Sequence, residues 1–332
     1  MGQKDITTKD YMKENTVFAD AFNKFIYKGE QVIRPENLKP LDTDLTAIPY
    51  GADGAGVPTQ RYRDVLKSVT AMEDENVVYL LLGIESQSEV HHAMPVRNMV
   101  YDTLQYAAQV EEAARCHREA RKAGGPKELA KKPDSGEYLS GFYREDWLIP
   151  VITLAVYFGA GEWDGPMCLH EMLSVQNPEI LSYISDYKLN LMAPEHMSDE
   201  EIDQFQTSLR EVMLFIKHSK DKAKLNEMVQ QDDRFKRMDR SAARVVSSVT
   251  GVEFKEDEEE KVDMCQALRE MMEEANNEGR QAGMQQGALE NAKETAHRML
   301  KEGCFSNELI AKMTGLSPVE VQSLAIDAVD RK

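Results

Sequence analysis

Near the start of the chain, apolar runs alternate with polar turns in the pattern of a β-hairpin. The run 77–84 is apolar, rich in β-formers and short enough to be a buried strand. It ends in the polar triplet 85–87. Residues 61–69 have the composition of a partner strand, and the charged segment 73–76 between the two runs predicts the turn.

The position of this turn predicts which residues of the hairpin face one another. In an antiparallel pair the numbers of opposed residues have a constant sum, so a turn centred between Asp74 and Glu75 places Asp64 opposite Glu85. Side chains alternate along a strand, so Glu85 and Gln87 extend from the same face. Two facing carboxylates repel each other, and a divalent cation is the simplest partner that makes the pair favourable. The pattern therefore predicts a metal site at Asp64 and Glu85.

Apolar spacing predicts further elements around the hairpin. The segment 16–28 has its apolar residues at helical spacing, and this predicted amphipathic helix includes Asp20. A second helix begins at Pro95, because proline is favoured in the first turn of a helix. Residues 148–158 are apolar apart from Thr153, which predicts a central strand.

The helix that begins at Pro95 carries a polar stripe. Arg97, Tyr101 and Gln105 recur at intervals of four residues and therefore share one side of the helix. If this side crosses the acidic pair, Arg97 would reach a phosphate and Gln105 would support the site. An ion pair of Arg97 within the core is an equally good interpretation.

The overall charge opposes binding to nucleic acid, whereas one segment favours it. The chain has 58 acidic and 40 basic residues and a formal net charge of −18, which favours solubility and repels a polyanion. Residues 114–132 carry a net charge of +5 and include Gly124, Gly125 and Pro126. This segment predicts a helix that runs into a loop, which either binds a phosphate backbone or is simply a solvated surface.

Several of these motifs resemble those of one nuclease family. An acid on one strand, followed on the next by an acid, a spacer and a polar residue, corresponds to the D-(D/E)-x-K pattern of metal-dependent nucleases, with Gln87 in place of lysine. Similarity extends over the segments 18–23, 84–88, 93–101 and 150–166 and over the glycine-spaced tail. The chain resembles the recombination-promoting nuclease (Rpn), or YhgA-like transposase, family of the PD-(D/E)XK superfamily.

This resemblance implies a fold and an activity. The expected fold is α/β, a restriction-endonuclease-like mixed sheet flanked by helices, with an α-helical C-terminal extension. The expected activity is Mg²⁺- or Mn²⁺-dependent hydrolysis of DNA, in which Asp64 and Glu85 bind the metal and Gln87 orients the water or the phosphate. The resemblance also nominates Asp20 as a metal ligand, for which a solvated or hydrogen-bonded aspartate is the alternative. Because Gln87 lacks the charge of lysine, Arg97 and the metal would carry more of the transition-state stabilisation.

Changes in composition along the chain predict four parts. These are a nuclease domain at 1–197, a helical extension at 198–255, an acidic linker with a glycine-spaced polar helix at 256–303, and a helix-turn-helix-like pair at 304–332.

The tail has features of an assembly module. Gly279, Gly283 and Gly287 recur at every fourth residue and share one side of the polar helix, which indicates either close helix packing or a flexible spacer. In the terminal pair, Ser317 and Glu320 predict a capping box. The second helix of this pair is poor in basic residues, so we expect it to mediate homo-oligomerisation or partner binding more readily than DNA reading.

Cysteine usage and hydropathy narrow the class of protein further. The four cysteines are far apart and form no C-x-x-C pair, which argues against a zinc site or a disulfide framework and favours the cytoplasm. The N-terminus lacks the apolar core of a signal peptide, and no stretch is apolar enough to span a bilayer.

The alternative to a nuclease is a catalytically weak or inactive relative that acts as a DNA-binding or regulatory interaction protein. Gln87 and the acidic balance favour that alternative.

Overall fold

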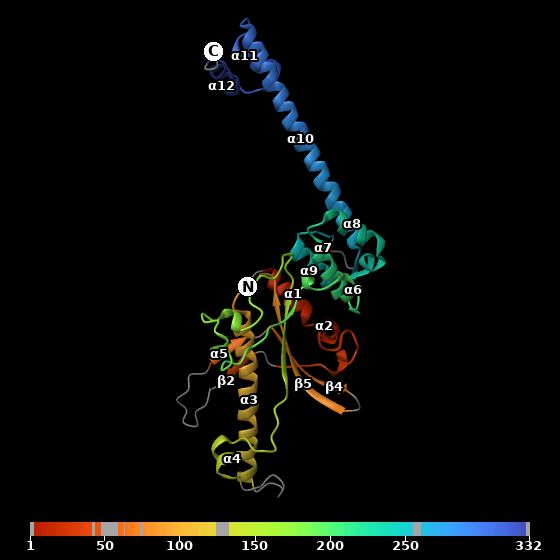
Figure 1. The fold of residues 1–332 in the computed structure, drawn as a ribbon. Helices are drawn as coiled ribbons and strands as arrows, with labels where there is room; N and C mark the ends of the chain where they lie inside the picture. The colour runs from red at the N-terminus through yellow and green to blue at the C-terminus, as the bar shows by residue number, and fades with distance from the viewer. Residues whose placement is uncertain are drawn as a thin grey trace. The chain divides into compact units, whose positions relative to one another are not determined.

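The protein, represented by a computed structural model, consists of two compact units, Met1–Cys265 and Gln266–Lys332 (Figure 1). The structure describes residues 3–41, 44–47, 59–62, 64–73, 76–123, 133–254 and 260–329.

A five-stranded mixed sheet forms the centre of the first unit, with the strand order β1-β4-β5-β6-β7. These strands are β1 (Lys39–Pro40), β4 (Val65–Glu73), β5 (Asn76–Gln87), β6 (Val151–Tyr157) and β7 (Asn190–Met192). Strand β4 is antiparallel to β1 and β5, whereas β5, β6 and β7 are parallel. Two short antiparallel pairs lie outside this sheet: β2 (Asp44–Ala47) with β3 (Thr59–Tyr62), and β8 (Met238–Asp239) with β9 (Lys261–Val262).

The β4–β5 hairpin has the register that its charged turn predicts. Val65 lies opposite Ile84, and the same constant sum relates Asp64 to Glu85. The predicted register is therefore confirmed. The predicted strand 61–69 is divided between β3 and β4, and Asp64 lies in a bend just before β4 begins.

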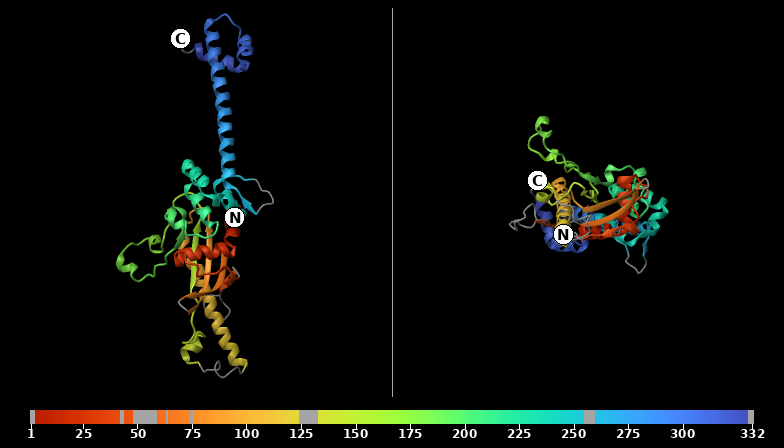
Figure 2. Two further views of the ribbon diagram at one scale, coloured as in Figure 1. Left: turned by 90° about the vertical axis from the view of Figure 1, so that its right-hand side faces the viewer. Right: turned by 90° about the horizontal axis from the view of Figure 1, so that it is seen from below.

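Helices cover both faces of this sheet (Figure 2). Helices α1 (Gln3–Met12) and α2 (Asn15–Tyr27) lie on the face from which Lys67 extends, where its Nζ is 4.5 Å from the ring centre of Phe18. Helix α3 (Met94–Ala123) lies on the opposite face, where Arg97 reaches Glu85. Strand alternation explains this arrangement, because Lys67 pairs with Leu82 and so does not share a face with Glu85.

The helical extension packs within the same unit as the sheet. Its helices are α6 (Asp199–Ile202), α7 (Leu209–His218), α8 (Lys222–Gln231) and α9 (Arg240–Thr250). Two short helices precede it, α4 (Ser135–Ser140) and α5 (Pro178–Leu181). Helix α7 contacts α2, and α9 contacts α1. The structure divides the chain between Cys265 and Gln266; the predicted domain boundaries stay predictions.

The described elements of the second unit are all helices. The unit contains most of α10 (Met264–Glu302) together with α11 (Asn307–Thr314) and α12 (Pro318–Val329). Its core joins the end of α10 to the terminal pair and includes Ala296, Ile310, Ala311, Leu316 and Val321. The predicted capping box is confirmed, because the Glu320 N–H donates to Ser317 Oγ over 3.3 Å and the Ser317 N–H donates to Glu320 Oε2 over 2.8 Å.

The predicted fold class is confirmed. The structure is a mixed α/β sheet flanked by helices, with a helical C-terminal region. Within the described ranges, no helix is both long and apolar enough to cross a membrane.

Candidate active site

The two acids predicted from the hairpin meet where β5 ends. The N–H of Asp64 donates to Glu85 Oε1 over 3.3 Å, and the N–H of Ser86 donates to Asp64 Oδ2 over 3.0 Å. Glu85 is fully buried and Asp64 is 8% exposed. Each carboxylate therefore accepts a backbone donor from the neighbouring strand, and this exchange holds the two acids next to each other.

Side-chain cations from two helices lie against this acidic pair. Arg97 Nη2, from α3, is 3.0 Å from Glu85 Oε2, and Lys9 Nζ, from α1, is 3.6 Å from Asp64 Oδ1. Two negative charges thus face two positive charges, and the repulsion expected between the carboxylates is relieved within the chain. The ion-pair interpretation of Arg97 is the one that the structure shows. Its contact with a phosphate stays a prediction.

The polar stripe of α3 continues from Arg97. Its Nε donates to the hydroxyl of Tyr101 over 3.2 Å, and its guanidinium lies 5.7 Å from the centre of that ring. Burial, and then the Glu85 carboxylate, raise the pKa of Tyr101, so its phenol stays protonated at neutral pH. Burial lowers and Glu85 raises the pKa of Arg97, with a net upward shift. Gln105 is buried one turn further along, and within the described part of the chain no hydrogen bond joins it to either carboxylate.

Gln87 is the last residue of β5 and extends from the same face as Glu85. Its carbonyl accepts from the N–H of Phe158 over 2.7 Å, which fixes this end of β5 to the chain just beyond β6. Its side chain is half-buried. Among the described residues, no hydrogen bond holds the Gln87 amide, which extends from the face that carries Glu85.

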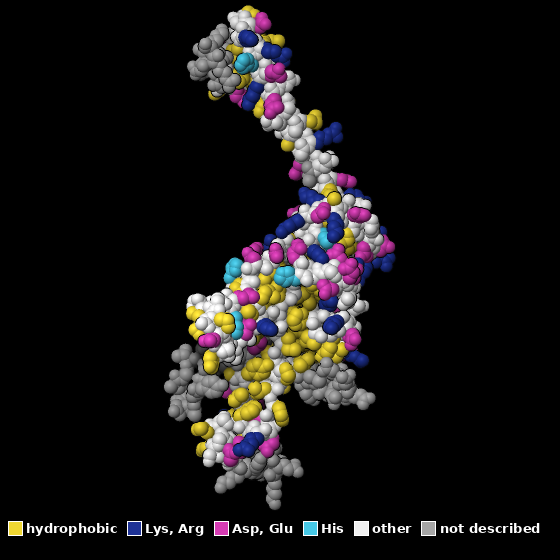
Figure 3. All heavy atoms as spheres, in the orientation of Figure 1, with side chains coloured by type: hydrophobic (Ala, Val, Ile, Leu, Met, Phe, Trp, Pro, Cys, Tyr) yellow, Lys and Arg dark blue, Asp and Glu magenta, His cyan; other side chains and the backbone are white. Residues whose placement is uncertain are grey.

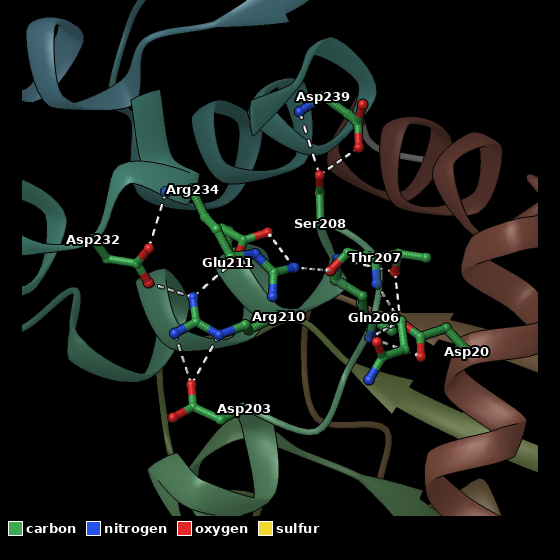
Figure 4. A network of polar contacts seen from close by, with 11 residues as sticks. Asp20, Asp203, Gln206, Thr207, Ser208, Arg210, Glu211, Asp232, Arg234 and Asp239 are labelled. Atoms are coloured by element: carbon green, nitrogen blue, oxygen red, sulfur yellow. Dashed lines mark hydrogen bonds and ion pairs between the residues drawn. The ribbon is translucent and has the colours of Figure 1, made fainter. Parts of the chain in front are cut away.

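Asp20 lies in a separate polar network (Figure 4). Its carboxylate accepts from the N–H of Gln206 over 3.0 Å, from the N–H of Thr207 over 2.8 Å and from the hydroxyl of Thr207 over 2.7 Å. The side chain is almost fully buried. Among the described residues, no hydrogen bond or ion pair joins Asp20 to Asp64 or Glu85. The contacts favour the hydrogen-bonded alternative, and metal binding by Asp20 stays a prediction without support from the structure.

Lys9 and helix α1 are the parts of the site that the sequence analysis missed. Helix α1 contains few strongly apolar residues, so its amphipathic pattern is weak. One signal is nevertheless present, because Thr8, Tyr11 and Met12 have the i, i+3, i+4 spacing of a helix face and all three are buried. That face predicts that the helix docks on the rest of the protein. A docked helix makes Lys9 a candidate for the functional site.

The basic segment 114–132 is described only as far as the end of α3. There Arg115 pairs with Glu112 and Glu119 over 2.6 and 2.8 Å, and Arg121 donates to the hydroxyl of a tyrosine. Residues 124–132 of the segment lie outside the described residues. Figure 3 shows Lys and Arg side chains interspersed with Asp and Glu on the face it presents. DNA contact by this segment stays a prediction.

The donor set of the site fits a hard divalent cation better than a soft one. Mg²⁺ is usually bound through one or two carboxylates, with water and phosphate oxygens completing its ligands. Asp64 and Glu85 supply two carboxylates at one place. The described residues contain no group of three or more His, Cys, Asp or Glu side chains that could hold a metal ion. A cation at this site would therefore depend on water or substrate for most of its ligands.

Comparison with known proteins gives one match. Residues 138–243 match the family model described as "Putative transposase, YhgA-like", which confirms the family resemblance seen in the sequence. This stretch includes β6, β7 and the helices α5 to α8 but not Asp64, Glu85 or Gln87. No curated protein and no solved structure matches the chain.

Proposed function

We propose that this chain, of which residues 138–243 match the model of the putative transposase, YhgA-like, family, is a metal-dependent DNA endonuclease of the PD-(D/E)XK type. The observation that carries the proposal is the meeting of Asp64 and Glu85 at the end of β5, where backbone hydrogen bonds hold two buried carboxylates together. Burying two acids at one point is costly unless cations compensate them. A site that combines the carboxylates of Asp64 and Glu85 with the cations of Lys9 and Arg97 is suited to binding a metal ion together with a polyanionic substrate.

Asp64 and Glu85 would hold Mg²⁺ or Mn²⁺. When bound there, the ion would supply Lewis-acid activation of a water molecule and of the phosphodiester. In the hydrolysis, the water oxygen bonds to phosphorus as the bond from phosphorus to the leaving sugar oxygen breaks. The water loses its proton to solvent, and the leaving oxygen gains one.

The chain's own side chains would position the reactants. Gln87 extends from the same face as Glu85, and no described residue hydrogen-bonds its amide, so it would orient the water or a phosphate oxygen. Arg97 is held by Glu85 and Tyr101 at the site. Its guanidinium has five donors and these contacts use only some of them, so it can also contact a phosphate.

A nicking assay tests this function. We expect the purified full-length protein to convert supercoiled plasmid to the open circular form with Mg²⁺ or Mn²⁺ present, and to stop when chelator is added. Absence of nicking with both ions, in protein shown to be folded by circular dichroism, would contradict the proposal.

Substitutions at Gln87 test its proposed role. If the amide orients a reactant, Gln87→Ala should lower the nicking rate about 10- to 100-fold and leave cation binding unchanged in calorimetry. Gln87→Lys should retain or increase the rate, because lysine adds a positive charge at the position where the nuclease pattern carries one. A folded but inactive Gln87→Lys protein would argue against the PD-(D/E)XK geometry.

One observation favours the second candidate, a DNA-binding or regulatory interaction protein with little or no catalysis. The ion pairs with Arg97 and Lys9 already neutralise both carboxylates, so the site is balanced without a metal. DNA binding that needs no divalent cation, in the absence of any nicking, would favour this function. Binding that strengthens with Ca²⁺, which occupies carboxylate sites, would favour the nuclease.

We further propose that the second unit mediates homo-oligomerisation. The side of α10 that carries Gly279, Gly283 and Gly287 is open, since a Cβ placed at any of the three meets no described atom within 4 Å. Glycine lowers the stability of a helix, so three of them on one side are better explained by close packing against a partner helix than by the needs of a solvated one.

A further inference from the structure

Helix α1 brings a lysine to the acidic pair. Lys9 Nζ lies 3.6 Å from Asp64 Oδ1, and the Lys9 side chain is 24% exposed. The Lys9 side chain is therefore partly exposed where it pairs with a nearly buried carboxylate. This contact joins residues far apart in the sequence, so it depends on where α1 docks.

Two hydrogen bonds to the hairpin fix α1 on either side of Lys9. Toward its N-terminus, Asp5 Oδ1 accepts from the hydroxyl of Ser88, just beyond β5, over 2.6 Å. Just past its C-terminus, the carbonyl of Lys13 accepts from Lys67 Nζ in β4 over 2.6 Å. Helix α1 also packs against α9 and β5. Lys9 lies between the two hydrogen bonds, so the docking of α1 holds its ammonium beside Asp64.

Among the described residues, no other lysine places an ammonium at Asp64 and Glu85, where the nuclease motif leads us to expect one. Gln87 is neutral, so β5 contributes no positive charge to the reacting phosphate. Lys67 is on the opposite face of the sheet, where its ammonium donates to the Lys13 carbonyl and to Asn15 Oδ1 over 2.7 Å. Arg97 is a cation at the site, but its guanidinium is engaged by Glu85.

We propose that Lys9 supplies from α1 the positive charge that Gln87 does not supply from β5. The inference rests on the proposed nuclease function and adds a catalytic residue to it. In the free protein Lys9 pairs with Asp64. With a cation on Asp64, the Lys9 ammonium would be free to stabilise the negative charge that develops on the phosphate oxygens. No bond to Lys9 forms or breaks.

The first test measures nicking by full-length Lys9→Gln. We expect the rate to fall about 100-fold. The control is Lys13→Gln, since Lys13 follows the same helix, is exposed and, in the described part of the chain, pairs with the neighbouring Asp10; it should nick like the wild type. Nicking by Lys9→Gln at the wild-type rate would overturn the inference and leave the proposed function intact.

The second test measures cation affinity by calorimetry without DNA. Removing the ammonium from Asp64 removes a competitor of the incoming cation, so Lys9→Gln should bind Mn²⁺ roughly tenfold more tightly. A lysine that only anchors α1 would not give tighter binding together with slower nicking. Unchanged cation affinity would overturn the inference, whether or not the wild-type protein nicks DNA.

The third test relocates the charge. The double variant Lys9→Gln with Gln87→Lys returns an ammonium to β5. We expect it to nick DNA at least tenfold faster than Lys9→Gln alone. Failure of this variant to recover, in protein that melts at the wild-type temperature, would contradict the idea that Lys9 and position 87 supply the same charge. Absence of nicking by the wild type would contradict the proposed function itself.

Discussion

Lys67 is a buried lysine whose ammonium contacts neutral groups. It donates to the carbonyl of Lys13 and to Asn15 Oδ1 and lies over the ring of Phe18. Burial lowers the pKa of Lys67 from 10.5 to about 8, because these partners do not fully replace the water that the charge loses.

This shift predicts how stability depends on pH. Between pH 8 and 10.5 the folded state has released the Lys67 proton while the unfolded state keeps it, so the free energy of unfolding should rise with pH in this range. Urea titrations at pH 7.5 and 9.5 should show that the wild type gains about 1–2 kcal/mol relative to Lys67→Met. The exposed Lys13→Gln variant should show no such gain. A difference between wild type and Lys67→Met that does not change with pH would contradict the assignment.

Asp20 provides a second prediction at the scale of single residues. Its carboxylate accepts two backbone donors and one hydroxyl from residues 206–207. In Asp20→Asn the amide nitrogen would face one of these donors, so we expect the free energy of unfolding in urea to fall by about 2–3 kcal/mol. Cation affinity in calorimetry should not change. Weaker cation binding with unchanged stability would instead show that Asp20 is a metal ligand.

At the scale of elements, α10 gives a test of assembly. Replacing Gly279, Gly283 and Gly287 together by Ala should stabilise an isolated helix by up to about 1 kcal/mol per position. If a partner helix packs on these glycines, the same change should lower the oligomeric state in light scattering. Gln281→Ala with Gln285→Ala, on another side of α10, is the control. An unchanged oligomeric state in the glycine variant would contradict the proposed contact.

The hairpin and its acids could be predicted because their signals are local. The charged turn fixes the register of β4 and β5, and strand alternation then places Asp64 and Glu85 together. Helix α2, strand β6 and the terminal helix pair also follow from short-range apolar spacing and capping residues. Each of these predictions depends on residues close in sequence, where simple rules on periodicity and turns apply.

The rest of the site depends on contacts that no local pattern reveals. Lys9 reaches Asp64 because α1 docks between the hairpin and α9, and the composition of α1 gives only a weak sign of this. Asp20 meets a segment 186 residues away in the sequence. Its place on the first long helix made it a plausible ligand, but the segment that takes up its carboxylate comes from the helical extension, whose docking the sequence did not predict.

At the scale of the whole molecule, the site is assembled by the entire first unit. The hairpin supplies the acids, α3 supplies Arg97, and α1 supplies Lys9. The extension contributes by packing against α1 and α2, so the stretch that matches the family model supports the site without containing its acids. This arrangement lets a chain of net charge −18 place two cations beside the two acids.

The most direct test of the central claim compares nicking by Asp64→Asn and Glu85→Gln with nicking by Asp102→Asn. Asp102 is a matched control, since it is a buried aspartate of α3 that bonds to the hydroxyls of Thr153 and Tyr187. We predict that both site variants lose at least 100-fold in Mg²⁺-dependent nicking and lose Mn²⁺ binding, while Asp102→Asn keeps both. Equal nicking by all folded variants and the wild type would show that these two carboxylates are not the catalytic centre.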